Sequence, residues 1–394
     1  MRTSNNILYK REIQLKSLNS SCFLMGPRMT GKTSLLNQLG ADVCFDLLDP
    51  QVEIAFRTRP HEFWEAISFL KPNMVVMVDE IQKIPKLLDY VQMGIDRKKI
   101  RFFLSGSSAR KLRHGGANLL GGRAIYFNLH PLTAHELGKD FNINTILRFG
   151  SLPLISSLIV QNHSKEAISH LKSYVTTYIK EEIKAESLVR KLDSFYRFLD
   201  VAVQCNGQMI EFANVSRECA VHVNTVKEHY SILEDTLMGQ FIWPFNRSER
   251  KKARPKFYFF DCGVIRALQN RLSDKPTSVE KGMLFETWIA NELIRIRDYS
   301  EYEHRISLWR KGRWEIDFII ESGGKPLIAI ECKTGRQIKN IHSLKAFQKD
   351  FPGIPIVICS LSDKRTRKLD KNIWIEPYRK TINRYRELSF RPLL

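Results

Sequence analysis

The sequence predicts an α/β protein with a parallel sheet in its first third, a helical middle and a second α/β domain in its last third. Three observations predict this fold class. Apolar strands alternate with helical patterns up to residue 108, helical spacing fills residues 165–205, and two adjacent apolar strands lie before residue 335. With 394 residues, 43% of them hydrophobic, the chain can form two or three domains. We expect a first α/β domain at 1–155, a helical linker and middle domain at 156–270, and a last domain at 271–394.

A phosphate-binding loop is predicted at residues 26–33, between an apolar strand and a helical pattern. Its residues fit GxxxxGK[ST] and are Gly26, Pro27, Arg28, Met29, Thr30, Gly31, Lys32 and Thr33. The glycines let successive N–H groups point at phosphate oxygens, and the helix N-terminus adds positive potential. We expect Lys32 to reach the β- and γ-phosphates of ATP and the Thr33 hydroxyl to ligate Mg²⁺. The alternative is a glycine-rich turn without a ligand.

A P-loop also needs a carboxylate at the end of a neighbouring strand, and the run MVVMVDE at 74–80 supplies one. Asp79 fits the metal shell, and Glu80 is placed to polarise the attacking water. The next apolar strand ends near Ser105 and Ser107. We expect Ser105 to contact the nucleotide as a sensor of the γ-phosphate; alternatively, both serines merely begin a loop.

Three arginines after this strand are candidates for an arginine finger, which neutralises transition-state charge from a neighbouring subunit. They are Arg110, Arg113 and Arg123. Arg123 is the one we place at the nucleotide, because it lies between a Gly-Gly pair and a predicted strand. A finger supplied in this way would require a homo-oligomer.

The chain resembles a family of prokaryotic AAA-type ATPases that join a P-loop domain to a winged helix and a restriction-endonuclease-like domain. The likeness covers nearly the whole chain in family order. The motifs that carry it are GPRMTGKTSLL, VVMVDEIQKIPKLL, FFLSGSSARKL, LLGGRA, LHPLTAHEL, FGSLP, PKFYFFDCGV, GMLFETWIANEL, LWRKGRWEIDFII and IAIECKTG. The resemblance implies this three-part architecture and ATPase activity, and it leaves the biological role open.

The middle of the chain predicts a helix-turn-helix followed by a basic hairpin. Two short helices are expected around a turn at 221–224, the second beginning at Thr225. That helix carries acids beside Lys227 and His229, so a packing module is as good an interpretation as a major-groove reader. Strands at 241–245 and 256–261 enclose a loop with five basic residues and one acid, which either contacts phosphates or is simply solvated.

The last third predicts a set of carboxylates of the PD-(D/E)XK nuclease type. Asp317 lies on one strand, and Glu331 and Lys333 share one face of the next strand because side chains alternate along it. Glu286, on a predicted helix, adds a further acid. Carboxylates of this kind bind Mg²⁺ ions that activate water, and a lysine neutralises developing charge. We therefore expect Glu286, Asp317 and Glu331 as metal ligands and Asp317, Glu331 and Lys333 as catalytic residues; alternatively, the acids are structural.

Composition indicates a polyanionic partner. Lys plus Arg is 62 against 42 for Asp plus Glu, a net charge of +20. Nucleic acid, DNA more than RNA, is the expected partner, although many surface lysines alone would give the same number. Scattered cysteines without CxxC pairs, and the absence of a signal-like or membrane-spanning apolar run, favour a cytoplasmic location without membrane contact.

Overall fold

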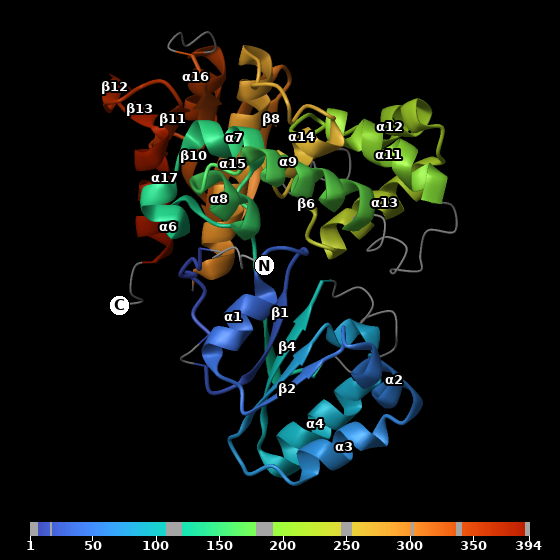
Figure 1. Cartoon of the computed structure of the whole chain (residues 1–394). Coiled ribbons are helices and arrows are strands. Elements are labelled where there is room, and N and C mark those ends of the chain that lie inside the picture. The colour runs from blue at the N-terminus through green and yellow to red at the C-terminus, as the bar shows by residue number, and fades with distance from the viewer. Residues whose placement is uncertain are drawn as a thin grey trace.

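The computed structural model describes residues 7–15, 18–107, 120–178, 192–245, 254–300, 303–335 and 341–390. It is an α/β structure with a parallel five-stranded sheet in the N-terminal third, a helical middle and a mixed six-stranded sheet in the last third (Figure 1). This confirms the predicted fold class. All seven cysteines are free, and in the described part of the chain no helix is long and apolar enough to cross a membrane.

The N-terminal sheet has the strand order β2-β3-β4-β1-β5, with every pair parallel. Its strands are β1 (Ser21–Met25), β2 (Val43–Asp46), β3 (Val75–Asp79), β4 (Arg101–Gly106) and β5 (Ala124–Asn128). The helical segments between them are α1 (Lys32–Leu39), α2 (Pro50–Thr58), α3 (His61–Ser68), the 3₁₀ turn η1 (Ile81–Lys83) and α4 (Leu87–Lys98).

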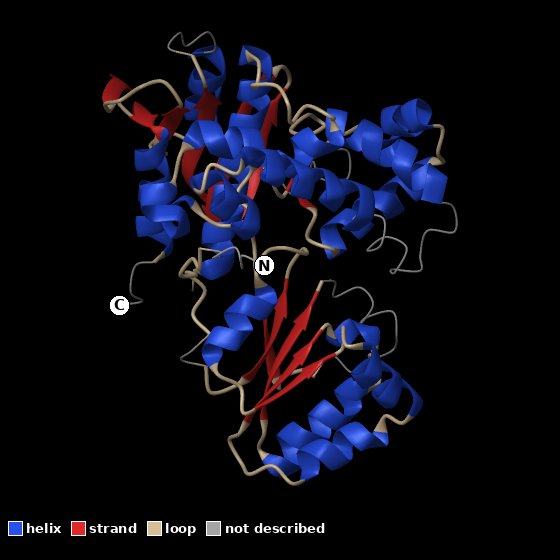
Figure 2. Ribbon diagram, in the orientation of Figure 1, coloured by secondary structure: helices blue, strands red, loops and turns tan. Residues whose placement is uncertain are grey.

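Both faces of this sheet are covered, as parallel sheets require (Figure 2). Neighbouring residues of β1 point to opposite sides: Phe23 packs with α3 and α4, while Leu24 packs with α1. The order places β4 between β1 and β3, so the carboxyl ends of these three strands lie next to one another. The P-loop follows β1, and Asp79 closes β3, so the sheet brings the two predicted motifs to one edge.

The helical middle contains α6 (Ala134–Leu137), η2 (Gly138–Asp140), α7 (Ile143–Phe149), α8 (Pro153–Val160), α9 (Ser164–Ser173), a π-turn η3 (Tyr174–Tyr178), α11 (Leu192–Gln204), α12 (Phe212–Cys219), α13 (Val223–Asp235) and α14 (Cys262–Leu268). The antiparallel strands β6 (Gly239–Ile242) and β7 (Lys256–Phe259) lie between α13 and α14. Two helices around a short turn are therefore present as expected, with α13 beginning two residues before Thr225. His229 is buried among Phe195 and Phe198, so it cannot read a groove.

The predicted strand at 241–245 ends early, and the reason is a change of partner. Pro244 has no N–H to donate to the hairpin ladder. The chain instead turns to β8 (Arg305–Lys311), where Leu308 donates its N–H to the Trp243 carbonyl and accepts one from Phe245 at 3.0 and 2.7 Å. The hairpin is thereby attached to the last third of the chain. The arginines and lysines at 247–252 lie outside the described residues, whereas Arg254 pairs with Glu211 at 3.0 Å.

The C-terminal sheet has the order β12-β13-β11-β10-β9-β8. Its remaining elements are α15 (Ser278–Tyr299), β9 (Trp314–Ser322), β10 (Lys325–Lys333), α16 (Ile341–Asp350), β11 (Ile356–Ser360), β12 (Arg367–Asp370), β13 (Ile373–Pro377) and α17 (Tyr378–Ser389). Strands β9 and β10 are antiparallel and joined by the predicted turn at Gly323-Gly324. One hydrophobic core joins residues from the helical middle, α15 and this sheet, so it runs across the expected boundary near residue 270.

Candidate nucleotide site and carboxylate cluster

The predicted phosphate-binding loop lies between the carboxyl end of β1 and the start of α1, and two of its positions require glycine. Gly31 has φ +91° at the N-cap of α1, a conformation that residues with a Cβ rarely adopt. A Cβ at Gly26 would lie 2.4 Å from the Leu129 carbonyl oxygen, so this position also requires glycine. The loop is closed by the buried Thr30, whose hydroxyl donates to the Pro27 carbonyl at 2.8 Å.

The residues predicted to hold Mg²⁺ and phosphate lie together. Thr33 donates its hydroxyl to Asp79 Oδ2 at 2.6 Å, although the two residues are 46 positions apart. The Lys32 ammonium is buried in the loop and donates to the carbonyls of Gly26 and Pro27 at 2.8 and 3.2 Å. A hydroxyl and a carboxylate are the oxygen ligands that Mg²⁺ prefers, so these side chains fit the ion.

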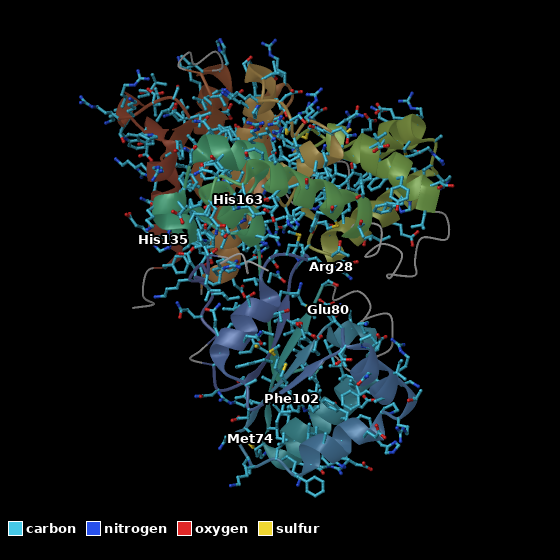
Figure 3. All side chains as sticks on the ribbon, in the orientation of Figure 1. Arg28, Met74, Glu80, Phe102, His135 and His163 are labelled. Carbon is cyan, nitrogen blue, oxygen red and sulfur yellow. The ribbon has the colours of Figure 1, made fainter. Side chains whose placement is uncertain are left out.

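Asp79 and Glu80 are held by polar residues from β4 and η1. Ser105 donates to Asp79 Oδ1, and its oxygen accepts the Glu80 N–H at 3.2 Å. Gln82, which the sequence analysis did not select, donates to Glu80 Oε2 and to the Ser107 hydroxyl at 3.0 Å. Figure 3 shows Glu80 and Arg28 at the end of the N-terminal sheet that faces the rest of the chain. The structure thus brings Ser105 to the acidic pair, and its role as a sensor stays a prediction.

A pocket of about 290 Å³ adjoins the P-loop and was not foreseen from the sequence. Its walls come from the N-terminal segment, from the P-loop and α1, and from α8; they are Ile7, Leu8, Tyr9, Arg11, Met29, Gly31, Ser34, Leu35, Gln38, Leu132, Pro153 and Leu154. The volume is near the lower end for small-molecule sites, and a mostly apolar wall with a few polar groups is typical of them. The segment at 7–11 has no periodic pattern, so no sequence signal could assign it to the site.

Arg11 joins this pocket to the helix α15. Its guanidinium donates to the carbonyl of Thr30 in the P-loop at 2.7 Å, to the His130 carbonyl at 2.6 Å and to the Tyr299 hydroxyl at 3.2 Å. It also forms a 2.9 Å ion pair with Glu136, and both side chains are almost fully buried. The P-loop therefore contacts, through one side chain, the last residue of α15.

Of the three candidate arginine fingers, only Arg123 falls in the described part of the chain. Arg110 and Arg113 lie outside it. Arg123 is partly exposed and pairs with Asp96 on α4 at 2.8 Å. Its predicted contact with a nucleotide would have to break this pair.

In the last third, β9, β10 and α15 bring the predicted acids together. The register that pairs Ile330 with Phe318 sets Asp317 beside the strand that carries Glu331. Asp317 Oδ2 accepts the Cys332 N–H at 2.8 Å, and Lys333 Nζ lies 2.6 Å from Glu331 Oε1.

The cluster contains a residue that the sequence analysis had placed in the hairpin. Lys256, on β7, lies among the acids, with its ammonium 2.8 Å from Glu286, 2.7 Å from Glu315 and 3.3 Å from Asp317. Tyr258, two residues along the same strand face, donates to Glu286 Oε1 at 2.6 Å. In the described residues no three His, Cys, Asp or Glu side chains are grouped to hold a metal ion. As arranged, Glu286, Asp317 and Glu331 do not fit a divalent cation, because the Lys256 ammonium takes up oxygens of Glu286 and Asp317 and Lys333 pairs with Glu331.

Burial and mutual repulsion keep protons on part of this cluster. Burial, together with the charge of Asp317, raises the pKa of Glu286 to about 7 and that of Glu331 to about 8. Burial alone would lower the pKa of Lys256, but the surrounding phenol and carboxylates raise it well above its usual value. Lys256 is therefore a permanent cation in the cluster at neutral pH.

Residues 19–138 match the family described as AAA domain, a range that contains the P-loop, Asp79 and Glu80. The N-terminal third is an AAA-type P-loop domain. Residues 132–275 match a domain of unknown function, DUF8612, and residues 281–380 match another, DUF4143. These two matches assign no activity, so the winged helix and the restriction-endonuclease-like domain stay predictions. A search among curated proteins found no match to the chain.

Two solved structures show a distant likeness. The ORC1 protein of Aeropyrum pernix, solved in complex with DNA, has 12% identity and a TM-score of 0.30 over 65% of this chain and 87% of that one. Can2 from Sulfobacillus thermosulfidooxidans, solved with cyclic tetra-adenylate, has 9% identity and a TM-score of 0.22 over 94% and 99%. Likeness at this level says nothing about function.

Proposed function

We propose that the AAA-type domain binds ATP with Mg²⁺ and hydrolyses it. The contact between Thr33 and Asp79 carries this proposal. Two oxygen groups suited to Mg²⁺, one in the first turn of α1 and one at the end of β3, lie 2.6 Å apart beside the glycine-containing loop. The bound metal ion would neutralise phosphate charge, and the adjoining pocket is suited to the base and sugar of the nucleotide.

Glu80 is the residue we propose to orient and polarise the attacking water. It follows Asp79 directly, and its carboxylate is held by Gln82. Ser105 contacts both Asp79 and Glu80, so a change in γ-phosphate contacts at this serine would reach both acids.

Two substitutions separate binding from turnover. Lys32→Ala should abolish tight binding of a fluorescent ATP analogue, because it removes the ammonium that pairs with the phosphates. Glu80→Gln should keep binding but lower ATP hydrolysis by about 10²-fold or more, since an amide cannot accept the water's proton. Lys71→Ala, an exposed lysine before β3, is the matched control and should behave as wild type. Hydrolysis by Glu80→Gln at the wild-type rate would remove Glu80 from the mechanism.

We further propose that ATP turnover is coupled to nucleic acid, DNA more than RNA, through the rest of the chain. The net charge of +20 and the basic hairpin support a polyanionic partner. A second candidate is a regulatory switch whose last domain binds nucleic acid or protein without cutting it. The Lys256 ammonium among the acids favours this second candidate, because it takes the oxygens that a nuclease would offer to Mg²⁺.

A cleavage assay decides between the two. Single-stranded and duplex DNA and RNA are incubated with the full chain and Mg²⁺ or Mn²⁺, with and without ATP. Cleavage that Asp317→Ala abolishes would establish a nuclease. Binding without cleavage, with ATP turnover intact, would establish the switch.

A further inference from the structure

The Lys256 ammonium lies among three carboxylates of the cluster. An ammonium carries three N–H groups, and three carboxylates, of Glu286, Glu315 and Asp317, lie within 3.3 Å of it. The side chain is 6% exposed, so solvent does not share these contacts. A surface lysine near acids by chance would not be enclosed in this way.

The cluster has more carboxyl groups than cations. Its carboxylates are those of Glu286, Glu315, Asp317 and Glu331, and its cations are Lys256 and Lys333. Glu331 is 6% exposed, and its Oε2 has no hydrogen-bond partner among the described residues. Glu331 therefore has one buried oxygen without a partner and one paired with the Lys333 ammonium. Such an arrangement suits a stronger positive charge.

We propose that Lys256 is a resident cation which takes the place of a divalent metal ion, and that removing its charge converts the cluster into a metal site. The ligands of that site are Glu286, Asp317 and Glu331. Mg²⁺ and Mn²⁺ take carboxylate oxygens, and these side chains are already held: Glu286 by Tyr258, and Asp317 by the Cys332 N–H. In the wild-type chain Glu286 and Asp317 are paired with the Lys256 ammonium, and Glu331 is paired with Lys333.

Lys256 reaches the cluster from a separate part of the chain. It lies 30 positions before Glu286 and 61 before Asp317, on the strand that follows the basic loop. The β6–β7 hairpin is thus tied to the last domain by an ion pair as well as by backbone bonds to Leu308. Whether the cluster binds a metal ion therefore depends on a residue of the hairpin as well as on the Asp-Glu-Lys motif.

The test is Mn²⁺ binding to the full chain without nucleotide, followed by electron paramagnetic resonance of free Mn²⁺. Every chain carries Thr33→Ala and Asp79→Ala, so that neither residue proposed to bind Mg²⁺ at the nucleotide site contributes to the measurement. The variants are Lys256→Met and the milder Lys256→Gln, each with and without Asp317→Ala, and Lys227→Met on an exposed lysine of α13 as the matched control. Circular dichroism identifies the variants that are folded.

The expected result is a single Mn²⁺ site in the folded Lys256 variant, at least tenfold tighter than in the parent, and lost with Asp317→Ala. Mn²⁺ should also raise the melting temperature of that variant and leave the parent and Lys227→Met unchanged. A parent chain that binds Mn²⁺ as tightly as the variant, through Asp317, would overturn the proposal. A folded Lys256 variant that binds no more tightly than its parent would overturn it too.

Discussion

Glu80 shows how a single residue departs from ordinary geometry at the nucleotide site. Its φ of +58° lies in the left-handed region, which residues with a Cβ seldom occupy. Such a conformation costs on the order of 1–3 kcal/mol and persists only where neighbours fix it. Here Ser105 holds the Glu80 N–H and Gln82 its carboxylate. The conformational free energy spent on the Glu80 backbone is consistent with a side chain positioned for a substrate.

The two raised carboxyl pKa values predict a pH dependence of stability. In the unfolded chain both groups titrate near 4.5, whereas in the folded chain the pKa of Glu286 is about 7 and that of Glu331 about 8. Between these values the folded chain binds more protons than the unfolded chain. The free energy of unfolding should therefore fall as the pH rises from about 4.5 to about 8, by up to about 1.4 kcal/mol per pH unit for each proton.

Glu331→Gln tests this dependence, because an amide has no proton to lose. Urea unfolding at several pH values should give a shallower slope for this variant than for wild type, with Glu303→Gln, an exposed control, unchanged. Parallel slopes for wild type and Glu331→Gln would show that the pKa of Glu331 is not raised.

At the scale of elements, α15 connects the two candidate sites. Glu286 and Tyr299 lie 13 residues apart on this helix, a span of about 20 Å at 1.5 Å per residue. Tyr299 contacts Arg11 beside the P-loop, and Glu286 contacts Lys256. His130 adds a 2.7 Å contact to Asp298 at the same helix end. A rigid helix with both ends bonded can carry a displacement from one site to the other.

Among the residues that make these contacts, Arg11 should lower the free energy of unfolding most when it is replaced. Arg11→Met leaves the fully buried Glu136 carboxylate without its ion-pair partner, which costs about 3–5 kcal/mol. Arg57→Met removes a pair with Glu53 in which the arginine side chain is 56% exposed, and should cost about 0–1 kcal/mol. Urea unfolding of both variants measures the difference. Equal losses would mean that the Arg11 pair contributes no more than a surface pair.

At the scale of the whole molecule, one hydrophobic core spans the expected boundary near residue 270. The helical middle, α15 and part of the C-terminal sheet share one hydrophobic core, while the N-terminal sheet has its own clusters on its two faces. Tyr299 of α15 packs into one of the N-terminal clusters. The AAA-type domain thus has its own core clusters, while the rest of the chain shares one core, and the boundary at residue 270 stays a prediction.

The net charge predicts salt-dependent binding of nucleic acid. Reversing the hairpin charges, with Arg250, Lys251, Lys252 and Arg254 changed to Glu, should weaken DNA binding. The slope of log affinity against log salt should become shallower by about 0.9 for each lost phosphate contact on duplex DNA. Fluorescence anisotropy at several salt concentrations measures it.

The matched variant reverses four exposed charges of the C-terminal region: Lys364, Arg365, Lys368 and Lys371. A slope that changes only in this second variant would move the nucleic-acid path from the hairpin to the C-terminal region. A slope unchanged in both variants would show that these side chains are solvated and contact no phosphate.

The sequence by itself determined the features whose chemistry is local. The P-loop, the acids that end β3, and the β9–β10 hairpin each depend on residues close together in the chain, where spacing and alternation dictate which side chains meet. Only the tertiary structure decided that Arg11 contacts the P-loop and that Lys256 occupies the carboxylate cluster. These contacts join segments 19 to 61 positions apart, with no motif between them. Their formation depends on how whole elements pack, because burial forces each isolated charge to find a partner wherever the fold supplies one.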